Sequence, residues 1–174
     1  LDRVLQFAST NFDAALEQIF PTMLAGAELV MRDSTVWTPQ ELFQIILRHK
    51  LTVINLPTAY WNQFMIEWSR MHKAVKTELR LIIIGGDLMT SDSLHGWEES
   101  SLGTARLLNA YGPTETTITA TIYDIPRSTQ VDLDKGAIPI GSAVLERSLY
   151  ILDTHGNPTP VGASGELYIG GFAV

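Results

Sequence analysis

Short apolar runs that alternate with helix-like segments constrain the fold of this chain more than any other feature. Residues 27–31, 51–56 and 79–84 have the pattern of strands, and the segments between them have the spacing of amphipathic helices. The run at 79–84 is almost continuously apolar, which is typical of a parallel strand covered on both faces. The alternation therefore predicts a parallel α/β sheet with right-handed crossovers and helices on its faces.

Helices are expected before and between these strands. Residues 12–25 have apolar side chains near helical spacing, and Asn11 or Asp13 could cap this helix. Pro21 should kink it or divide it into two short helices. Three further helices are expected to begin near Thr38, Thr58 and Ser91.

The sequence changes character after about residue 119. Three β-rich stretches at 119–125, 148–153 and 166–170 are separated by turns rich in Gly, Pro and Asn, without helical periodicity. We therefore expect an α/β part over about residues 1–118, followed by an antiparallel β-rich part over about residues 119–174.

Composition narrows the classes of partner. The net charge of −7 argues against nucleic acids and anionic membranes, because both require clustered basic residues, so a small molecule is the better candidate. The chain has no cysteine, which excludes thiolate nucleophiles and cysteine-ligated zinc and is compatible with a cytoplasmic location. No apolar run approaches the ~20 residues that span a bilayer.

Two loops at predicted strand ends are candidate sites. In LLNAYGPTETTITAT, residues 107–121, an apolar strand breaks at Tyr111-Gly112-Pro113 and polar residues follow. A plain β-turn explains that break equally well when it is considered alone. The loop after residue 84 lacks both the P-loop and the G-x-G-x-x-G pattern, and Asp87 would repel a phosphate, so an uncharged part of a ligand fits it better.

Taken together, several segments resemble the adenylate-forming (AMP-binding) enzymes, and most closely the adenylation domains of nonribosomal peptide synthetases. In order they are FDAALEQIF (12–20), LPTAY (56–60) with IIGGD (83–87), NAYGPTETT (109–117), and IPIGSAVLERSLYILD with GELYIGG from residue 138 onward. The chain departs from the usual pattern at Gln18 and Asp87, where Glu is common, and at 145–147, where Leu-Glu-Arg replaces an Ala-Asn-Thr type of turn.

The resemblance implies an enzyme that joins a carboxylic acid to ATP and passes the acyl group to the phosphopantetheine thiol of a carrier protein. It implies that Thr114 donates to the α-phosphate and that Glu115 holds Mg²⁺, although a solvated turn carboxylate is the alternative for Glu115. Tyr111 would stack on adenine and Asn109 would bond its edge. The implied nucleotide-binding residues are Gly86, Asp87, Leu88, Asn109, Ala110, Tyr111 and Gly112.

The resemblance also implies an amino-acid pocket. Asp13 would bind the α-ammonium group, with a helix cap as the alternative role. Glu17 would need a partner inside such a pocket: a cationic side chain of a basic amino acid, Asn55, or another donor of the protein. The other pocket residues implied are Ala14, Asn55, Ile83, Gly85, Ala110, Ile118 and Thr119.

Some expected motifs are absent from the sequence. It contains no Ser/Thr/Gly-rich loop ending in Lys and no Tyr-Arg-Thr-Gly-Asp segment. The resemblance thus implies a central piece of the large domain, inactive alone, whose partners are the remaining parts of that domain and a carrier-protein domain. Two alternatives stay open: a piece of an acyl-CoA or aryl-acid ligase, for which Asp13 would have no ammonium to bind, and a non-catalytic ligand-binding or docking module.

Overall fold

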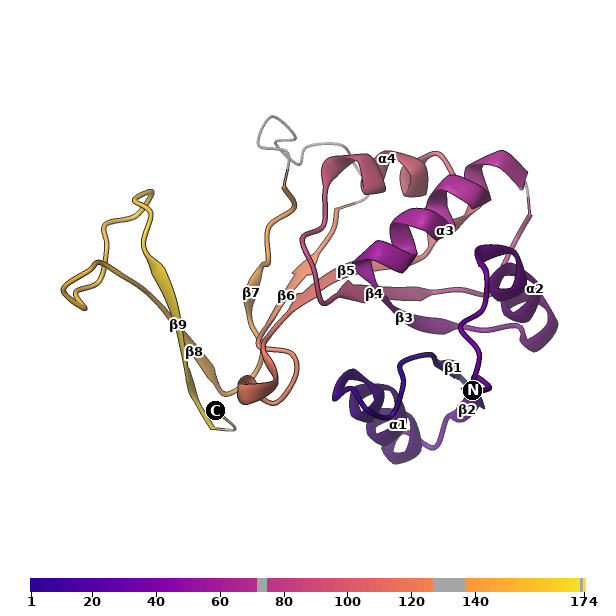
Figure 1. The fold of residues 1–174 in the computed structure, drawn as a ribbon, viewed down its shortest axis with the longest axis horizontal. Coiled ribbons are helices and arrows are strands. Elements are labelled where there is room, and N and C mark those ends of the chain that lie inside the picture. The colour runs from indigo at the N-terminus through magenta and orange to yellow at the C-terminus, as the bar shows by residue number, and fades with distance from the viewer. Residues whose placement is uncertain (72–74, 127–136, 173) are drawn as a thin grey trace.

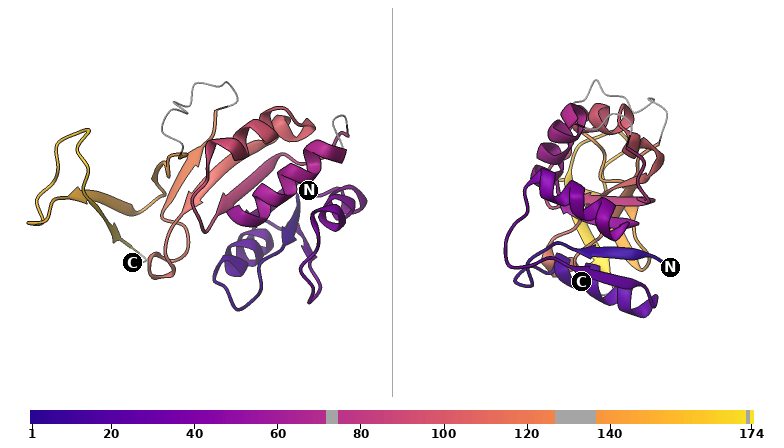
Figure 2. Two further views of the ribbon diagram at one scale, coloured as in Figure 1. Left: turned by 45° about the horizontal axis from the view of Figure 1, so that its top comes forward. Right: turned by 90° about the vertical axis from the view of Figure 1, so that its right-hand side faces the viewer.

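The computed structural model describes residues 1–71, 75–126, 137–172 and 174. Within these residues a seven-stranded sheet has the order β2-β1-β3-β4-β5-β6-β7, and a separate two-stranded sheet is formed by β8 and β9 (Figure 1). The two sheets differ in surroundings, because helices lie against the first, whereas the second extends away from them (Figure 2).

The first five strands are parallel, and the rest are antiparallel. The strands are β1 Arg3–Gln6, β2 Glu28–Met31, β3 Val53–Pro57, β4 Leu81–Gly85, β5 Arg106–Tyr111, β6 Thr121–Asp124, β7 Ser142–Ala143, β8 Arg147–Leu152 and β9 Glu166–Gly171. The helices are α1 Ala14–Leu24, α2 Pro39–His49, α3 Thr58–Met71 and α4 Ser91–Glu98, with the 3-10 turns η1 Ser101–Thr104 and η2 Thr114–Thr116.

The predicted fold class is confirmed, with two differences of detail. The sequence patterns did not reveal β1, which is short and has polar residues at both ends, yet pairs between β2 and β3. The part after residue 119 is antiparallel as predicted, but β6 and β7 extend the main sheet, so that only β8 and β9 stand apart.

Local signals account for where the helices begin and end. Thr38 caps α2 in a capping box: its hydroxyl accepts from the Glu41 N–H, and the Glu41 carboxylate accepts from the Thr38 N–H at 2.7 Å. The first helix corrects two expectations. It runs unbroken through Pro21 rather than dividing, and Asp13 occupies its N-cap position without a side-chain capping bond.

The core lies on one face of the main sheet, beneath α2, α3 and α4. Trp61, Phe64 and Trp68 of α3 are at most 1% exposed, and the ring of Trp68 meets that of Phe43 edge-on at 5.0 Å. Helix α1 lies on the opposite side, beside β1 and β2 (Figure 1). The aromatic stripe of α3 is therefore core packing.

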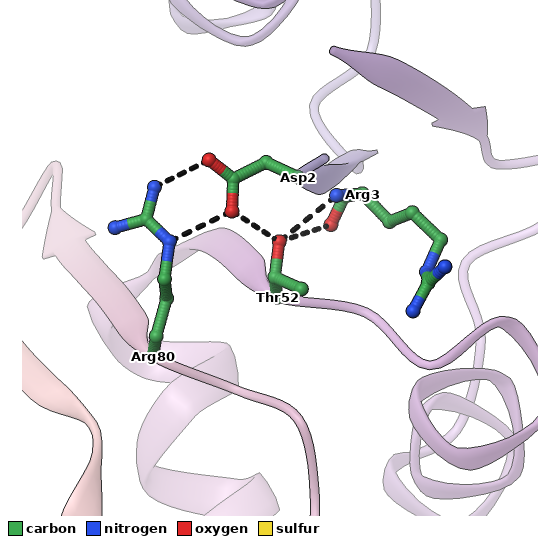
Figure 3. Close-up of polar contacts among 4 residues, drawn as sticks. All are labelled: Asp2, Arg3, Thr52 and Arg80. Carbon is green, nitrogen blue, oxygen red and sulfur yellow. Dashed lines mark hydrogen bonds and ion pairs between the residues drawn. The ribbon is translucent and has the colours of Figure 1, made fainter.

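A polar cluster ties the amino-terminal ends of the strands together (Figure 3). The Arg80 Nε donates to the Asp2 carboxylate at 2.7 Å, and the Thr52 hydroxyl donates to the same carboxylate at 2.8 Å. The bond from Arg80, with that from Thr52, lowers the pKa of Asp2 to about 2. Charged and polar side chains thus join the amino-terminal ends of β1, β3 and β4. The loops that carry the predicted site residues lie at the opposite, carboxyl ends of the strands.

Candidate nucleotide and substrate site

The order of the strands reverses at β1, the position at which open α/β sheets form a ligand-binding crevice. The chain passes from β1 outward to β2 and then back across β1 to β3, so α1 covers one face and α2 to α4 cover the other. Between β1 and β3 the described register contains a single pair, Val4 with Val53, whereas β1 pairs with β2 at four positions. In open α/β sheets, ligands bind at the carboxyl ends of strands beside such a reversal.

Gln18 of α1 bridges this crevice with its side-chain amide. Its Oε1 accepts from the backbone N–H groups of Phe7 at 2.8 Å and Ala8 at 2.9 Å, and its Nε2 donates to the carbonyl of Asn55 at 3.0 Å. A glutamate carboxylate could make the first two bonds but could not donate the third. Glutamine rather than glutamate at this position therefore allows the bond to β3. Its three bonds anchor α1 beside the strand ends.

The anchored helix brings two predicted pocket carboxylates close together. Burial raises the pKa of Glu17 most, and the negative charge of Asp13 raises it further, against hydrogen bonds from the hydroxyl and backbone of Thr119. The protein donor that meets Glu17 is thus Thr119 rather than Asn55. No ion pair among the described residues involves Asp13 or Glu17.

The strands present four of the other predicted pocket residues on a single face. Asn55 pairs with Ile83 across β3 and β4, and Gly85 pairs with Ala110 across β4 and β5. An added Cβ at Gly85 would lie 2.7 Å from the carbonyl oxygen of Ala110, so the two strands approach too closely there for a side chain. All nine predicted pocket residues are half-buried, as expected for the wall of an open site: Asp13, Ala14, Glu17, Asn55, Ile83, Gly85, Ala110, Ile118 and Thr119.

The predicted nucleotide-binding residues line a common cavity. It has a volume of about 350 Å³, within the range of about 300–1,000 Å³ typical of small-molecule sites. All seven predicted residues contribute to its wall, namely Gly86, Asp87, Leu88, Asn109, Ala110, Tyr111 and Gly112. The structure thus brings together two loops that are more than twenty residues apart in the sequence.

Four further residues line the cavity that sequence reasoning did not assign to the site: Met89, Pro113, Ile138 and Ile140. The Ile138 N–H donates to the carbonyl of Met89, and the Asn109 side-chain amide donates to the carbonyl of Pro139, each at 2.9 Å. Asn109 therefore also holds the segment that closes the cavity. The IPIG string at 138–141 was the available signal, but its distance of about thirty residues from the loop gave no reason to place it here.

Hydrogen bonds hold the first loop of the cavity. The Thr58 hydroxyl lies 3.2 Å from the carbonyl oxygen of Gly85 and 3.1 Å from that of Asp87, and it donates to both. The Asp87 carboxylate accepts from the N–H of Leu88 at 2.7 Å. That bond occupies the Leu88 N–H, which is therefore not free to bind a ligand.

The loop after β5 folds back on Gly112. A Cβ at this position would lie 2.1 Å from the carbonyl oxygen of Ile118, so close backbone approach requires glycine here. The unusual backbone conformations occur instead at Thr117 and Ile118, with φ of 52° and 78°. Such values are rare for β-branched residues, and they cluster at functional sites.

The two predicted catalytic residues lie on η2 at the tip of this loop. Thr114 and Glu115 are both exposed beside the cavity wall formed by Tyr111, Gly112 and Pro113. Among the described residues there is no group of three or more His, Cys, Asp or Glu side chains that could hold a metal ion.

A larger hollow of about 670 Å³ lies elsewhere, around the beginning of α2. Its wall includes Trp37, Gln40, Gln44 and Arg48, and none of the predicted site residues. The volume alone does not make it the better candidate, because the smaller cavity has the strand-end loops and the convergent polar groups. As a separate finding, no described helix has both the length and the apolar character needed to cross a membrane.

Known proteins resemble this chain over its whole length. The family model for AMP-binding enzymes matches residues 1–174. Over 95% of its length the chain is 36% identical to the isonitrile lipopeptide synthase of Streptomyces coeruleorubidus, and over 99% it is 33% identical to tyrocidine synthase 1 of Brevibacillus parabrevis. It spans only 11% and 15% of these two relatives.

Solved structures share the fold. PA1221, a nonribosomal peptide synthetase protein with adenylation and carrier (PCP) domains, superposes with a TM-score of 0.84 at 26% identity, over 99% of this chain and 33% of that one. The amino-terminal subdomain of Klebsiella oxytoca NpsA, in complex with 3-hydroxybenzoyl-AMSN, gives 0.84 at 21% identity, over 99% and 42%. The chain therefore belongs to the AMP-binding enzymes, and within that family it matches the adenylation domains of nonribosomal peptide synthetases.

Proposed function

We propose that the chain is the central part of an adenylation domain that activates an amino acid with ATP, forming aminoacyl-AMP and pyrophosphate, and then loads a carrier-protein thiol. One observation supports this most strongly: all seven residues assigned to the nucleotide from sequence line one cavity, with Thr114 and Glu115 on the adjoining turn. We further propose that the remaining parts of the same domain and a carrier-protein domain, with its phosphopantetheine, are the partners.

The cavity suits a purine base. Tyr111 is 41% exposed and offers a planar surface for stacking, and Gly86 on the opposite loop adds no side chain that would narrow the slot. Thr114 then donates its hydroxyl to the α-phosphate. Mg²⁺, held in part by the Glu115 carboxylate, would neutralise phosphate charge during attack by the amino-acid carboxylate.

The half-buried face of the sheet is where we place the amino acid. Asp13 makes no capping bond, so its carboxylate can receive the α-ammonium group. Glu17 keeps a raised pKa despite its bonds from Thr119, because Asp13 is near and burial removes water. A cation on the substrate's side chain would stabilise the charged form of Glu17. We therefore propose a basic amino acid such as lysine as the substrate.

Exposed apolar side chains indicate where the rest of the domain packs. Phe20, Met23 and Leu24 on the outer side of α1 are 56% or more exposed. A monomer rarely leaves such a patch uncovered. We propose that other parts of the same adenylation domain cover it and close the half-buried face.

Amino-acid-dependent exchange of pyrophosphate into ATP, measured on the full-length protein that contains this chain, tests the proposed function. Glu115→Gln removes a charge from the metal site and should cut the rate sharply and raise the Mg²⁺ requirement. Glu28→Gln, on the exposed edge strand β2, is the matched control. An unchanged rate and Mg²⁺ dependence in Glu115→Gln would reject its assignment. The 174-residue chain alone should be inactive, since its sequence has no Lys-ending phosphate loop.

A substrate panel tests the amino-acid assignment. Lysine and ornithine should exceed neutral aliphatic and aromatic amino acids, and benzoates should be inactive because they offer Asp13 no ammonium. Glu17→Gln should weaken the preference for basic amino acids and keep the requirement for an α-amino group. A wild-type preference for neutral amino acids would leave Glu17 as a structural partner of Thr119, and activity with benzoates would favour an aryl-acid ligase.

A further inference from the structure

Arg147 joins the separate hairpin to the turn that bears Thr114 and Glu115. It is the first residue of β8, and its Nη2 donates to the carbonyl of Thr116 at 3.0 Å, within η2. Its Nη1 lies 3.3 Å from the carbonyl oxygen of Phe172, just beyond β9, and donates to it. One planar guanidinium thus contacts both the hairpin and the turn of the candidate site.

The backbone around Arg147 passes from one sheet to the other through a strained turn. The Arg147 N–H donates to the carbonyl of Val144 at 3.1 Å, and Glu146 between them has φ of 66°. That value is in the left-handed region, where glutamate is disfavoured and asparagine is better tolerated. The Glu146 carbonyl accepts from the N–H of Phe172 at 3.1 Å, which holds the turn against the end of β9.

The charge of Arg147 is committed to backbone carbonyls rather than to an acid. No ion pair among the described residues involves it, and its Nε is buried without a partner. A half-buried cation held in this way has a definite structural role, because burying an unpaired guanidinium is otherwise unfavourable. The carbonyl it binds belongs to Thr116, the residue after Glu115, so the bond orients the peptide next to the proposed metal ligand.

We propose that Arg147 is a positioning residue that holds the Thr114–Thr116 turn from the β8–β9 hairpin, so that the position of the hairpin sets the position of the Glu115 carboxylate. The catalytic consequence rests on the proposed function, but the mechanical coupling does not. Lysine would not replace Arg147 fully, since a single ammonium lacks the planar fork that reaches two carbonyls.

The test uses the full-length protein with Arg147→Met, Arg147→Lys and the control Arg106→Met. Arg106 pairs with Asp124 on exposed positions of β5 and β6, so the control removes an arginine away from the turn. Two readouts are measured: the Mg²⁺ concentration for half-maximal pyrophosphate exchange, and amide hydrogen exchange across residues 114–119 and 166–172. Thermal melting identifies any variant that fails to fold.

Arg147→Met should raise the half-maximal Mg²⁺ concentration about tenfold, the effect of losing one charge-assisted hydrogen bond. The KM for the amino acid should change by less than this, because Gln18 anchors helix α1, which carries Asp13 and Glu17, and only the Thr119 bonds to Glu17 come from the loosened segment. Hydrogen exchange should accelerate in both segments together. Arg147→Lys should fall between the wild type and Arg147→Met, and it serves as the test if Arg147→Met does not fold.

The proposal is overturned if Arg147→Met matches Arg106→Met in both Mg²⁺ dependence and hydrogen exchange. It is also overturned if only residues 166–172 exchange faster, since the hairpin would then loosen without affecting the turn. A wild type inactive with every substrate would contradict the proposed function alone, and the hydrogen-exchange comparison would still decide whether Arg147 couples the two segments.

Discussion

The two faces of the main sheet differ in how completely the described chain covers them. Beneath α2, α3 and α4, the side chains of Ile54, Ile82 and Ile84 are 0% exposed. On the opposite face of the same strands, Asn55 and Ile83 are only half-buried. Neighbouring residues of one strand therefore have different environments, because successive side chains point to opposite faces of the sheet.

The two faces therefore serve different purposes: one stabilises the fold, and the other holds the predicted pocket residues. The covered face holds aromatic and aliphatic side chains in close contact, whereas the other face holds two carboxylates, an amide and a glycine at a close approach of two strands. Parallel sheets are normally covered on both faces. Because the described chain covers only one face of this sheet fully, we expect a ligand or further protein to cover the other face.

The most direct test of the difference between the two faces is to truncate two adjacent isoleucines of β4. Ile84→Ala should lower the free energy of unfolding by about 2–5 kcal/mol, because it leaves a cavity in the core. Ile83→Ala should cost less than about 1.5 kcal/mol, because its side chain is half-exposed, and should instead alter amino-acid selectivity. Urea denaturation measures both. Equal losses of stability would show that the two faces are covered alike.

The next effect concerns Gln18, which joins helix α1 to the end of β1 and to β3. Gln18→Leu leaves the N–H groups of Phe7 and Ala8 without their acceptor, and should destabilise the protein by about 1–3 kcal/mol. Gln18→Glu restores the acceptor but not the donor to Asn55, and should recover part of the loss. Denaturation midpoints of the three proteins give the order, and a Leu variant as stable as the wild type would contradict the bridging role.

A smaller effect distinguishes function from stability on the half-buried face. The pKa of Glu17 is raised in the folded state, so the folded protein binds more protons than the unfolded one, and stability falls as pH rises above the ordinary glutamate pKa of about 4.3. Glu17→Gln should therefore be more stable than the wild type at pH 7, with the advantage lost at pH 4. Thermal melting at the two pH values measures this. A glutamine variant less stable at pH 7 would mean that the Thr119 bonds outweigh burial.

The smallest expected effect is at the amino-terminal edge, where the Asp2 cluster is largely exposed. The pKa of Asp2 is lowered to about 2, so its contribution is present above about pH 4 and is lost as pH falls toward 2. Asp2→Asn should therefore show a shallower loss of stability across this range. Acid titration monitored by circular dichroism compares the two proteins, and parallel curves would show that the bond from Arg80 contributes nothing measurable.

Local pattern was sufficient for the parallel strands β2 to β5, whereas the loops of the cavity were assigned through the family resemblance. The apolar runs that became β3, β4 and β5 were predicted within a few residues of their ends, because burial imposes a periodicity that can be read along the chain. The short strand β1 was not predicted, because its polar ends hide the pattern, and Pro21 was overrated as a helix breaker in a helix that packs against β1 and β2.

The sequence by itself determined the fold class, the family resemblance and seven of the eleven residues that line the smaller cavity, because each depends on segments whose order and spacing are written along the chain. Only the tertiary structure decided which distant groups meet: Gln18 with Asn55, Glu17 with Thr119, Asn109 with Pro139, and Arg147 with Thr116. The reason is physical. Such polar contacts depend on the direction of single side chains across 30 or more residues of intervening chain, and no local periodicity encodes that direction.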